Sequence, residues 1–442
     1  MRPQSESDRS SEGPRLMSRS SFVKLLLAAT AASGLGLGVH PREAIAAVAH
    51  PRLIATATDF AALKSRILLD PDLTADKIRL LSKADSYVNA LLPPSSWGGS
   101  RDEPFLERMF TCGAAHMLYG TSTLTKYGDR CARELLHMAN NVPNWAPDKW
   151  LTMGSTAAGI AIGYDYAYDR LTSSQRSKVL SKIKSKCFDS FLARDEDDPH
   201  AYNWNIITNC GIGMLALAVE GDVGYTTTLQ GVFARVEKLL GEGGFANLDK
   251  AAPYQQNIIN IDGGYKEGPS YWAFAMPLAT YFLASWLTAK GTHSHWFNDT
   301  PGLRRTVEFA CHATGPTGRY FRFSDGDETS ANRNMTHLAG WYGKQCGDEV
   351  YKWVHNDGWR LQPSSRVNGR FAFLSMLWKD GNGVSPRAAG YPLDASFART
   401  HVVTMRSDWE DPEALYVASR VGGDVDRGHT HLDRGLLPGT RY

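Results

Sequence analysis

The stretch of sequence that decides the fold is DGGYKEGPSYW, which runs from Asp262 to Trp272. Its glycines and proline predict a tight turn, and the turn opens into residues 271–287, which are apolar on almost every side. A helix without a polar face is expected to lie deep inside a protein. The turn would then present Tyr265, Glu267 and Tyr271 at the mouth of a buried helix, and a tight loop with packed tyrosines is the plainer alternative.

Helical periodicity extends outward from this segment over residues 59–380, where apolar residues recur every three or four positions. Thr172 and Gln175 form a predicted capping box at the start of one helix, and a second helix is predicted from about Trp204 to Val219. Long helices joined by short turns predict stacked antiparallel hairpins. We therefore expect a mainly α protein, in which residues 50–385 form an α/α toroid.

The pattern changes after Pro386, where short runs rich in β-branched and aromatic residues lie between Asp, Pro and Gly. We predict strands at residues 398–406 and 414–421. So few strands do not form an independently stable sheet. Residues 386–442 are therefore expected either to pair with the helical part or to begin a domain that is cut short at Tyr442.

The first residues, 1–49, have the pattern of an export signal of the twin-arginine or Sec type. Basic residues precede an apolar run from Leu25 to Val39, and small residues suited to cleavage follow before His50. We expect an exported protein, periplasmic or secreted, with an uncleaved anchor as the alternative. No later run reaches the roughly 20 apolar residues that a membrane helix needs.

The composition is that of a globular protein, with 43% hydrophobic and 21% charged residues among 442. A formal net charge of +2 gives no sign of nucleic-acid binding. The six cysteines show no C-x-x-C spacing, which argues against a cysteine-built zinc site. In an exported protein one or two disulfides are allowed, and buried free thiols are the equal alternative. The sequence does not indicate an oligomeric state.

Two asparagines, Asn203 and Asn205, stand at the start of the helix predicted from Trp204. Asparagine is a favoured N-cap residue, so capping accounts for one of them. The other amide is left to point elsewhere from a buried helix end, and His200 adds a titratable group just before it. We interpret this cluster as a candidate site.

Near the C-terminus, His429, His431 and Asp433 alternate along a predicted strand. Residues two apart on a strand face the same side, so two imidazoles and a carboxylate would project together. This set suits a metal or an anionic ligand, and a solvated strand face is the plainer alternative. An acidic turn at residues 323–328 is less informative, because calcium binding and simple solvation predict the same composition.

Three segments together resemble the heparinase II/III-like polysaccharide lyases and their uronate-epimerase relatives. They are the N-W-N helix start, the turn ending in E-G-P-S-Y-W and the H-T-H-L-D-R-G segment that ends at Gly435. The motifs at residues 50–53, 163–166 and 405–409 extend this resemblance over nearly the whole chain. It implies an incomplete α/α toroid followed by an antiparallel β-sandwich with a cleft between them, and the sandwich is expected to be truncated here.

The family's reaction is β-elimination beside a uronic acid, which needs donors for the uronate carboxylate, a base and an acid. By resemblance, Asn205 and His429 neutralise the carboxylate. A tyrosine supplies both base and acid if its pKa, about 10 when free, is lowered. Tyr271 is the first choice for this tyrosine and Tyr265 the second, and His200 either acts from the opposite face or is only a loop residue.

The resemblance also implies a binding surface for an acidic polysaccharide. We expect substrate contacts from Asn203, Trp204, Glu267, Trp272 and Arg322. His431 and Asp433 resemble half of the family's metal site, so a structural zinc or calcium ion is expected there, and the chemistry itself requires no cofactor.

Three other functions fit the same residues. A uronate C-5 epimerase would remove the same proton and return it to the other face. A glycoside hydrolase on an α/α toroid would use two carboxylates, Asp165 or Glu267 with Asp325. An inactive carbohydrate-binding remnant would retain the fold without turnover.

Overall fold

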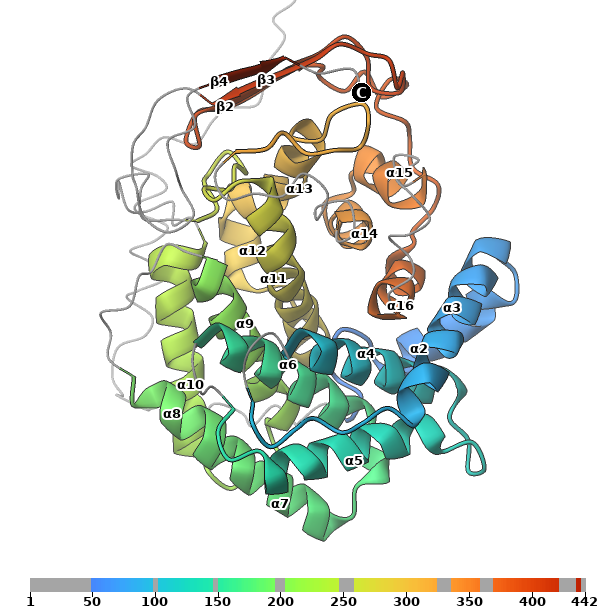
Figure 1. Ribbon diagram of the computed structural model, residues 1–442, viewed down its shortest axis with the longest axis vertical. Coiled ribbons are helices and arrows are strands. Elements are labelled where there is room, and N and C mark those ends of the chain that lie inside the picture. The colour runs from blue at the N-terminus through green and yellow to red at the C-terminus, as the bar shows by residue number, and fades with distance from the viewer. Residues whose placement is uncertain are drawn as a thin grey trace, which may run out of the picture. The chain divides into compact units, whose positions relative to one another are not determined.

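The computed structural model describes residues 49–97, 102–145, 150–194, 203–245, 258–323, 335–357, 369–420 and 435–438 (Figure 1). Within these residues the chain is mainly helical. The helices in the first half are α2 (Ala57–Ile67), α3 (Pro71–Val88), α4 (Asp102–Tyr119), α5 (Lys126–Asn141), α6 (Trp150–Tyr166), η1 (Tyr168–Arg170), α7 (Ser173–Ile183), η2 (Lys184–Phe188) and α8 (Asp189–Leu192). Those that follow are α9 (Asn203–Val219), α10 (Thr226–Leu239), η3 (Leu240–Gly244), α11 (Pro269–Lys290), α12 (His295–Asp299), α13 (Pro301–His312), α14 (Met335–Cys346), α15 (Glu349–Asp357) and α16 (Gly369–Trp378).

The central helices α4, α6, α9 and α11 pack side by side (Figure 1). Glycines allow α6 and α9 to touch, because a Cβ added at Gly211 would lie 2.0 Å from the carbonyl oxygen of Gly154. The two helices run in the same direction: Gly154 near the start of α6 meets the first turns of α9, and Tyr164 near its end donates to Asp222 just beyond α9. Helices α5 and α10 follow α4 and α9 and pack against them, which confirms the predicted helical hairpins.

The last helices of the chain pack back against the first ones. Helix α11 contacts α14, where the Tyr281 hydroxyl lies 3.0 Å from Nε2 of His337. Helix α14 contacts α16, and α16 contacts α4, where the backbone N–H of Arg370 donates to Glu107 over 3.3 Å. The described helices thus pack in a ring around a continuous apolar core.

The helix predictions for the centre of the chain are confirmed. Every residue of α9 except Trp204 is buried, and α11 is buried along nearly all of its length. Gly268 precedes α11 with φ +88° and Gly291 ends it in the left-handed region, a conformation that glycine adopts without strain. The capping box of Thr172 and Gln175 is present with both of its hydrogen bonds.

A small antiparallel sheet follows the helices. Its strands pair in sequence order and are β1 (Ala395–Phe397), β2 (Val402–Arg406), β3 (Tyr416–Arg420) and β4 (Gly435–Pro438). The predicted start of the first strand is wrong, because residues 398–401 form the turn between β1 and β2. His401 has φ +57° in that turn, which ends the extended backbone.

One arginine attaches the sheet to α13. A terminal guanidinium nitrogen of Arg406 donates toward the carbonyls of Cys311 (3.3 Å), His312 (3.0 Å) and Thr314 (2.9 Å) at the end of that helix. Its guanidinium also lies over the ring of Trp409, 3.6 Å from the centroid. The M-R-S-D-W motif is therefore an anchor between the sheet and the helices.

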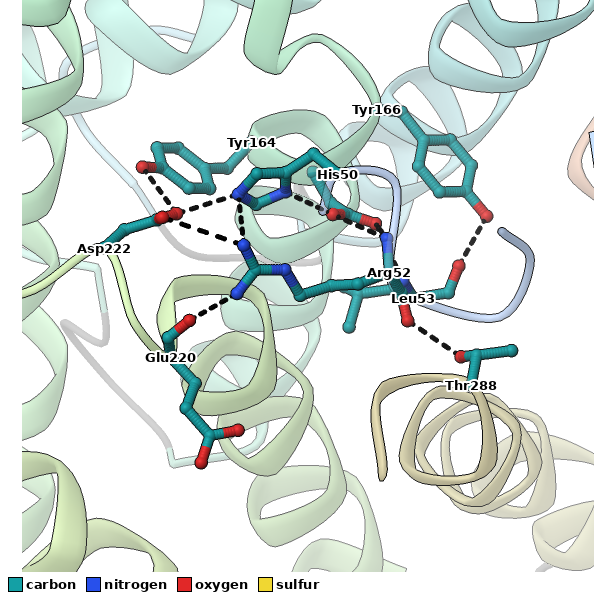
Figure 2. A network of polar contacts seen from close by, with 9 residues as sticks. His50, Arg52, Leu53, Tyr164, Tyr166, Glu220, Asp222 and Thr288 are labelled. Carbon is teal, nitrogen blue, oxygen red and sulfur yellow. Dashed lines mark hydrogen bonds and ion pairs between the residues drawn. The ribbon is translucent and has the colours of Figure 1, made fainter. Parts of the chain in front are cut away.

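The N-terminal strap (residues 50–53) is fixed to the ends of the central helices (Figure 2). The carboxylate of Asp165 in α6 accepts from the backbone N–H groups of Arg52 (2.9 Å) and Leu53 (2.8 Å). The Arg52 side chain donates to the carbonyl of Glu220, which follows the last residue of α9. A buried carboxylate with several N–H donors is well satisfied, so Asp165 is a structural anchor of this strap.

His50 lies between two carboxylates in the same network (Figure 2). Its Nδ1 is 2.5 Å from Asp165 and its Nε2 is 2.8 Å from Asp222. Burial alone would lower the pKa of His50, and the Arg52 guanidinium acts in the same direction, but the hydrogen bonds to the two carboxylates raise the pKa above its ordinary value of 6.5.

This raised pKa predicts a pH-dependent stability. The contribution of His50 is fully present below the unfolded-state pKa of 6.5 and is lost as the pH rises through the folded-state pKa. The effect of His50 is isolated by comparison with His50→Gln, because the buried His312 and His337, whose pKa values burial lowers, change stability in the opposite direction near pH 6.5. We expect the difference in the free energy of unfolding between wild type and His50→Gln, measured by denaturant titration from about pH 6 to about pH 9, to shrink in favour of the variant as the pH rises. A difference that does not change with pH would contradict the assignment.

All six cysteines are free thiols, five of them buried, so the free-thiol alternative is the correct one. Burial raises the pKa of Cys112 to about 12, which makes this thiol unreactive. Among the described residues, no helix combines the length and apolarity needed to cross a bilayer. The proposed export signal lies outside the described residues.

Candidate active site

The turn before α11 is shaped by its glycines. Ile259 and Tyr265 form an antiparallel bridge, and the N–H of Asn260 donates to the carbonyl of Gly264 over 2.9 Å. Gly263 has φ +89°, and a Cβ there would lie 2.7 Å from the carbonyl oxygen of Arg305. Only glycine fits this position without strain, which explains the D-G-G sequence in structural terms.

The same turn is braced by the sheet. The Asp262 carboxylate accepts from the N–H of Gly264 and from the N–H of Arg399, each over 3.0 Å. Arg399 lies in the turn between β1 and β2. Asp262 therefore connects the sheet to the segment that leads into α11.

Glu267 joins the starts of α9 and α11. It lies just before α11, and its carboxylate accepts from the backbone N–H (2.9 Å) and from Nδ2 (3.0 Å) of Asn203, the first residue of α9. Both residues are buried. A carboxylate is favoured at a helix N-terminus, where backbone N–H groups lack partners. The contact places Asn205 and Tyr271, each in the first turn of its helix, at the same end of two adjacent helices.

The side-chain amide of Asn205 forms hydrogen bonds with groups outside the first turn of α9. Its Nδ2 donates to the carbonyl of Leu239 at the end of α10 over 2.9 Å, and its Oδ1 accepts from Nδ2 of Asn209 over 3.1 Å. Asn205 is 8% exposed, so its side chain lies at the edge of the protein interior. Capping accounts for neither of these bonds.

The two candidate tyrosines have different surroundings. Tyr265 is fully buried, and burial, reinforced by the charge of Glu267, raises its pKa far above the ordinary value. A catalytic base requires the opposite shift, so we remove Tyr265 from the site. Tyr271 is partly exposed and packs against the core in the first turn of α11. The helix N-terminus there favours negative charge.

Several residues expected to contact substrate belong to the core instead. Trp272 is fully buried, and its indole N–H donates to Thr306 over 2.7 Å. Asn203 and Glu267 are buried against one another, so neither is available to a polymer. Trp204 is partly exposed and Arg322 is exposed, and both remain candidates.

A cation near the start of α11 was not recognised in the sequence. The guanidinium of Arg420, at the end of β3, lies 5.0 Å from the centroid of the Phe323 ring. That ring would be 3.1 Å from a Cβ at Gly268, the residue before α11. Arg420 is thus close to the helix start that carries Tyr271. A single arginine in a strand gives no sequence signal of this proximity.

The two alternative carboxylates considered for hydrolysis, Asp165 and Glu267, lie in different parts of the structure. Asp165 lies in the N-terminal strap network near the end of α6, whereas Glu267 lies at the start of α11 and binds Asn203. Each of them was expected to pair with Asp325, so the hydrolase alternative stays a prediction. Asp325 lies outside the described residues.

Four predicted site residues also lie outside the described residues: His200, His429, His431 and Asp433. In the part of the chain that is described, no group of three or more His, Cys, Asp or Glu side chains could hold a metal ion. The metal half-site of His431 and Asp433 stays a prediction.

This chain is similar in fold to several solved polysaccharide lyases. The chondroitin AC lyase of Streptomyces coelicolor A3, in complex with chondroitin sulphate, has a TM-score of 0.51 at 13% identity over 82% of this chain and 53% of its own. A heparan sulfate lyase from Pedobacter heparinus has a TM-score of 0.47 at 14% identity over 78% of this chain and 49% of its own. A heparinase III has a TM-score of 0.47 at 12% identity over 78% of this chain and 51% of its own.

This chain spans about half the length of those lyases. No family model matches it, and no curated protein matches it in sequence. The match to the chondroitin AC lyase confirms, at the level of the fold, the resemblance that was inferred from the sequence motifs. The likeness is one of fold, and the described helices are arranged as an α/α toroid.

The Glu267 contact can be tested by stability. Glu267→Gln keeps the shape of the side chain and removes its charge, which weakens both hydrogen bonds to the start of α9. We expect a loss of about 1–2 kcal/mol in the free energy of unfolding, measured in urea. Glu349→Gln, at the exposed first turn of α15, is the matched control and should change stability by under about 0.5 kcal/mol. Equal effects of the two variants would argue against this role of Glu267.

Proposed function

We propose that this protein is a polysaccharide lyase that cleaves a uronic-acid-containing polysaccharide by β-elimination. The observation that carries the proposal is the Asn203–Glu267 contact, which brings the starts of α9 and α11 together. Asn205 and Tyr271 belong to the first turns of these two helices, which supports a shared site. The fold likeness to a lyase that binds chondroitin sulphate supports an acidic polysaccharide as the substrate class.

The proposed reaction has two proton transfers. A base removes the proton on the carbon beside the uronate carboxylate, the bond to the leaving glycosidic oxygen breaks, a carbon–carbon double bond forms, and the leaving oxygen receives a proton. The proton removed is weakly acidic because an ionised carboxylate stabilises the developing negative charge poorly. Hydrogen-bond donors to that carboxylate therefore lower the barrier.

In this proposal Tyr271 is the base and then the acid. Its place in the first turn of α11 supports the phenolate form, because the partial positive charge of the helix N-terminus acts there. Asn205 donates to the carboxylate from the adjacent start of α9. His429, known here from sequence alone, is the second proposed donor, and Arg420 adds positive charge beside α11.

An epimerase needs the same base and the same donors, so a reaction readout has to separate the two functions. Purified protein is incubated with heparan sulfate, chondroitin sulfate, alginate and glucuronan. A lyase produces ultraviolet absorbance from the unsaturated uronate together with shorter chains. An epimerase exchanges the uronate proton in D2O without shortening the chain, and a hydrolase produces new reducing ends without absorbance. Binding without any of these changes would support the carbohydrate-binding remnant.

A further inference from the structure

Two neighbours hold the side chain of Asn205 in one orientation. Nδ2 of Asn209, one helical turn along α9, donates to both the backbone oxygen (2.8 Å) and the Oδ1 (3.1 Å) of Asn205. On the other side, Nδ2 of Asn205 donates to the carbonyl of Leu239 over 2.9 Å. The oxygen of the amide therefore faces a donor, and its nitrogen faces an acceptor.

The second neighbour belongs to a helix of unusual form. Helix α10 ends at Leu239 and continues as the π-helical turn η3, and such wider turns are frequent at functional sites. Gly244 ends this turn beside the amide, because a Cβ there would lie 2.9 Å from Oδ1 of Asn205. The space around the amide is thus shaped by a π turn, a glycine and Asn209.

This arrangement has a chemical consequence for an anionic ligand. An amide has one acceptor oxygen and two N–H donors. With the oxygen turned toward Asn209 and one N–H bound to Leu239, the oxygen is kept away from an incoming carboxylate. A rotated amide would present that oxygen to the carboxylate, and two acceptors repel each other.

We propose that Asn209 is a positioning residue, which acts on the uronate carboxylate only through the amide of Asn205. The inference rests on the proposed function. Asn209 is 3% exposed and is not expected to touch the polymer itself. Its donor fixes the direction of a group whose misplacement by a fraction of an ångström slows catalysis strongly.

A double-mutant cycle tests this inference. We expect Asn209→Ala to lower kcat by about 10- to 100-fold with KM nearly unchanged. In the Asn205→Ala background the same substitution should have no further effect on kcat, since Asn209 then has no amide to orient. Asn209→Asp, which keeps the shape and removes the donor, should lower kcat at least as much as Asn209→Ala. Ser285→Ala, a buried polar residue farther along α11, is the control and should leave kcat unchanged.

Two results would overturn the proposal. Multiplicative effects of Asn205→Ala and Asn209→Ala on kcat would show that Asn209 acts independently of the amide. Full activity of Asn209→Asp would show that its donor is unnecessary. If Asn205→Ala retains the wild-type rate, or if no polymer is cleaved, the proposed function fails and this inference fails with it. If Asn205→Ala loses activity and Asn209→Ala does not, only this inference fails.

Discussion

Tyr271→Phe is expected to lower kcat for depolymerisation by about 10²- to 10⁴-fold, the range that general acid–base groups contribute. Phenylalanine keeps the ring that packs against the core and removes the hydroxyl that would take and return the proton. Far less change is expected in KM and in thermal stability. The measurement is the initial rate of ultraviolet absorbance on the best polymer from the panel.

Tyr265→Phe is the matched control, because the same atom is removed six positions earlier in the chain. The Tyr265 hydroxyl is fully buried and has no hydrogen-bond partner among the described residues. Its loss should leave kcat within a few-fold of wild type and should not destabilise the protein. If Tyr265→Phe is inactive and Tyr271→Phe is active, the roles of the two tyrosines are the reverse of those proposed.

The contrast between these tyrosines also marks the limit of sequence reasoning. The bounds of α9 and α11 were predictable, because apolar periodicity and the glycines and proline around the helix ends are local features. Which of Tyr265, Tyr271 and Trp272 would be exposed was not predictable. All three lie within eight positions, and the buried partner of the Trp272 indole, Thr306, is 34 positions farther along the chain.

Glu267 and the first strand show the same limit. Glu267 reads as a polar residue at the mouth of a helix, but its partner Asn203 is 64 positions away, so only the tertiary structure reveals it as a buried link. The strand predicted from residue 398 included a turn, because β-propensity alone gives no information on the positive φ of His401. The pair of Asn205 and Asn209 does have a local signal, because residues four apart share one face of a helix, but Asn209 was not recognised from the sequence.

The largest expected effect on stability is that of Arg406→Ala. The substitution removes donors from the carbonyls at the end of α13 and a guanidinium that lies over the rings of Trp409 and Tyr416. Burial lowers the pKa of Arg406 to about 10, so desolvation of the guanidinium offsets part of the stabilisation that its contacts provide, while the carbonyls at the end of α13 lose their donor in the variant. We expect a loss of at least about 3 kcal/mol in the free energy of unfolding, measured by denaturant titration with tryptophan fluorescence.

Two further variants separate anchoring from charge. Arg406→Lys keeps the charge but not the planar group that stacks on the rings, so it should recover only part of the stability. Arg399→Ala, whose side chain is exposed in the turn between β1 and β2, should change stability by under about 0.5 kcal/mol. Equal stabilities of the Arg406→Ala and Arg399→Ala variants would contradict an anchoring role.

Loosening the sheet should also lower activity, and by more than the unfolded fraction explains. The sheet reaches the proposed site at two points: the N–H of Arg399 binds Asp262 in the turn before α11, and Arg420 lies over Phe323, which packs on Gly268. Arg406→Ala assayed at a temperature where it stays folded should therefore show a reduced kcat. A folded Arg406→Ala variant with wild-type kcat would mean that α9 and α11 hold the site without the sheet.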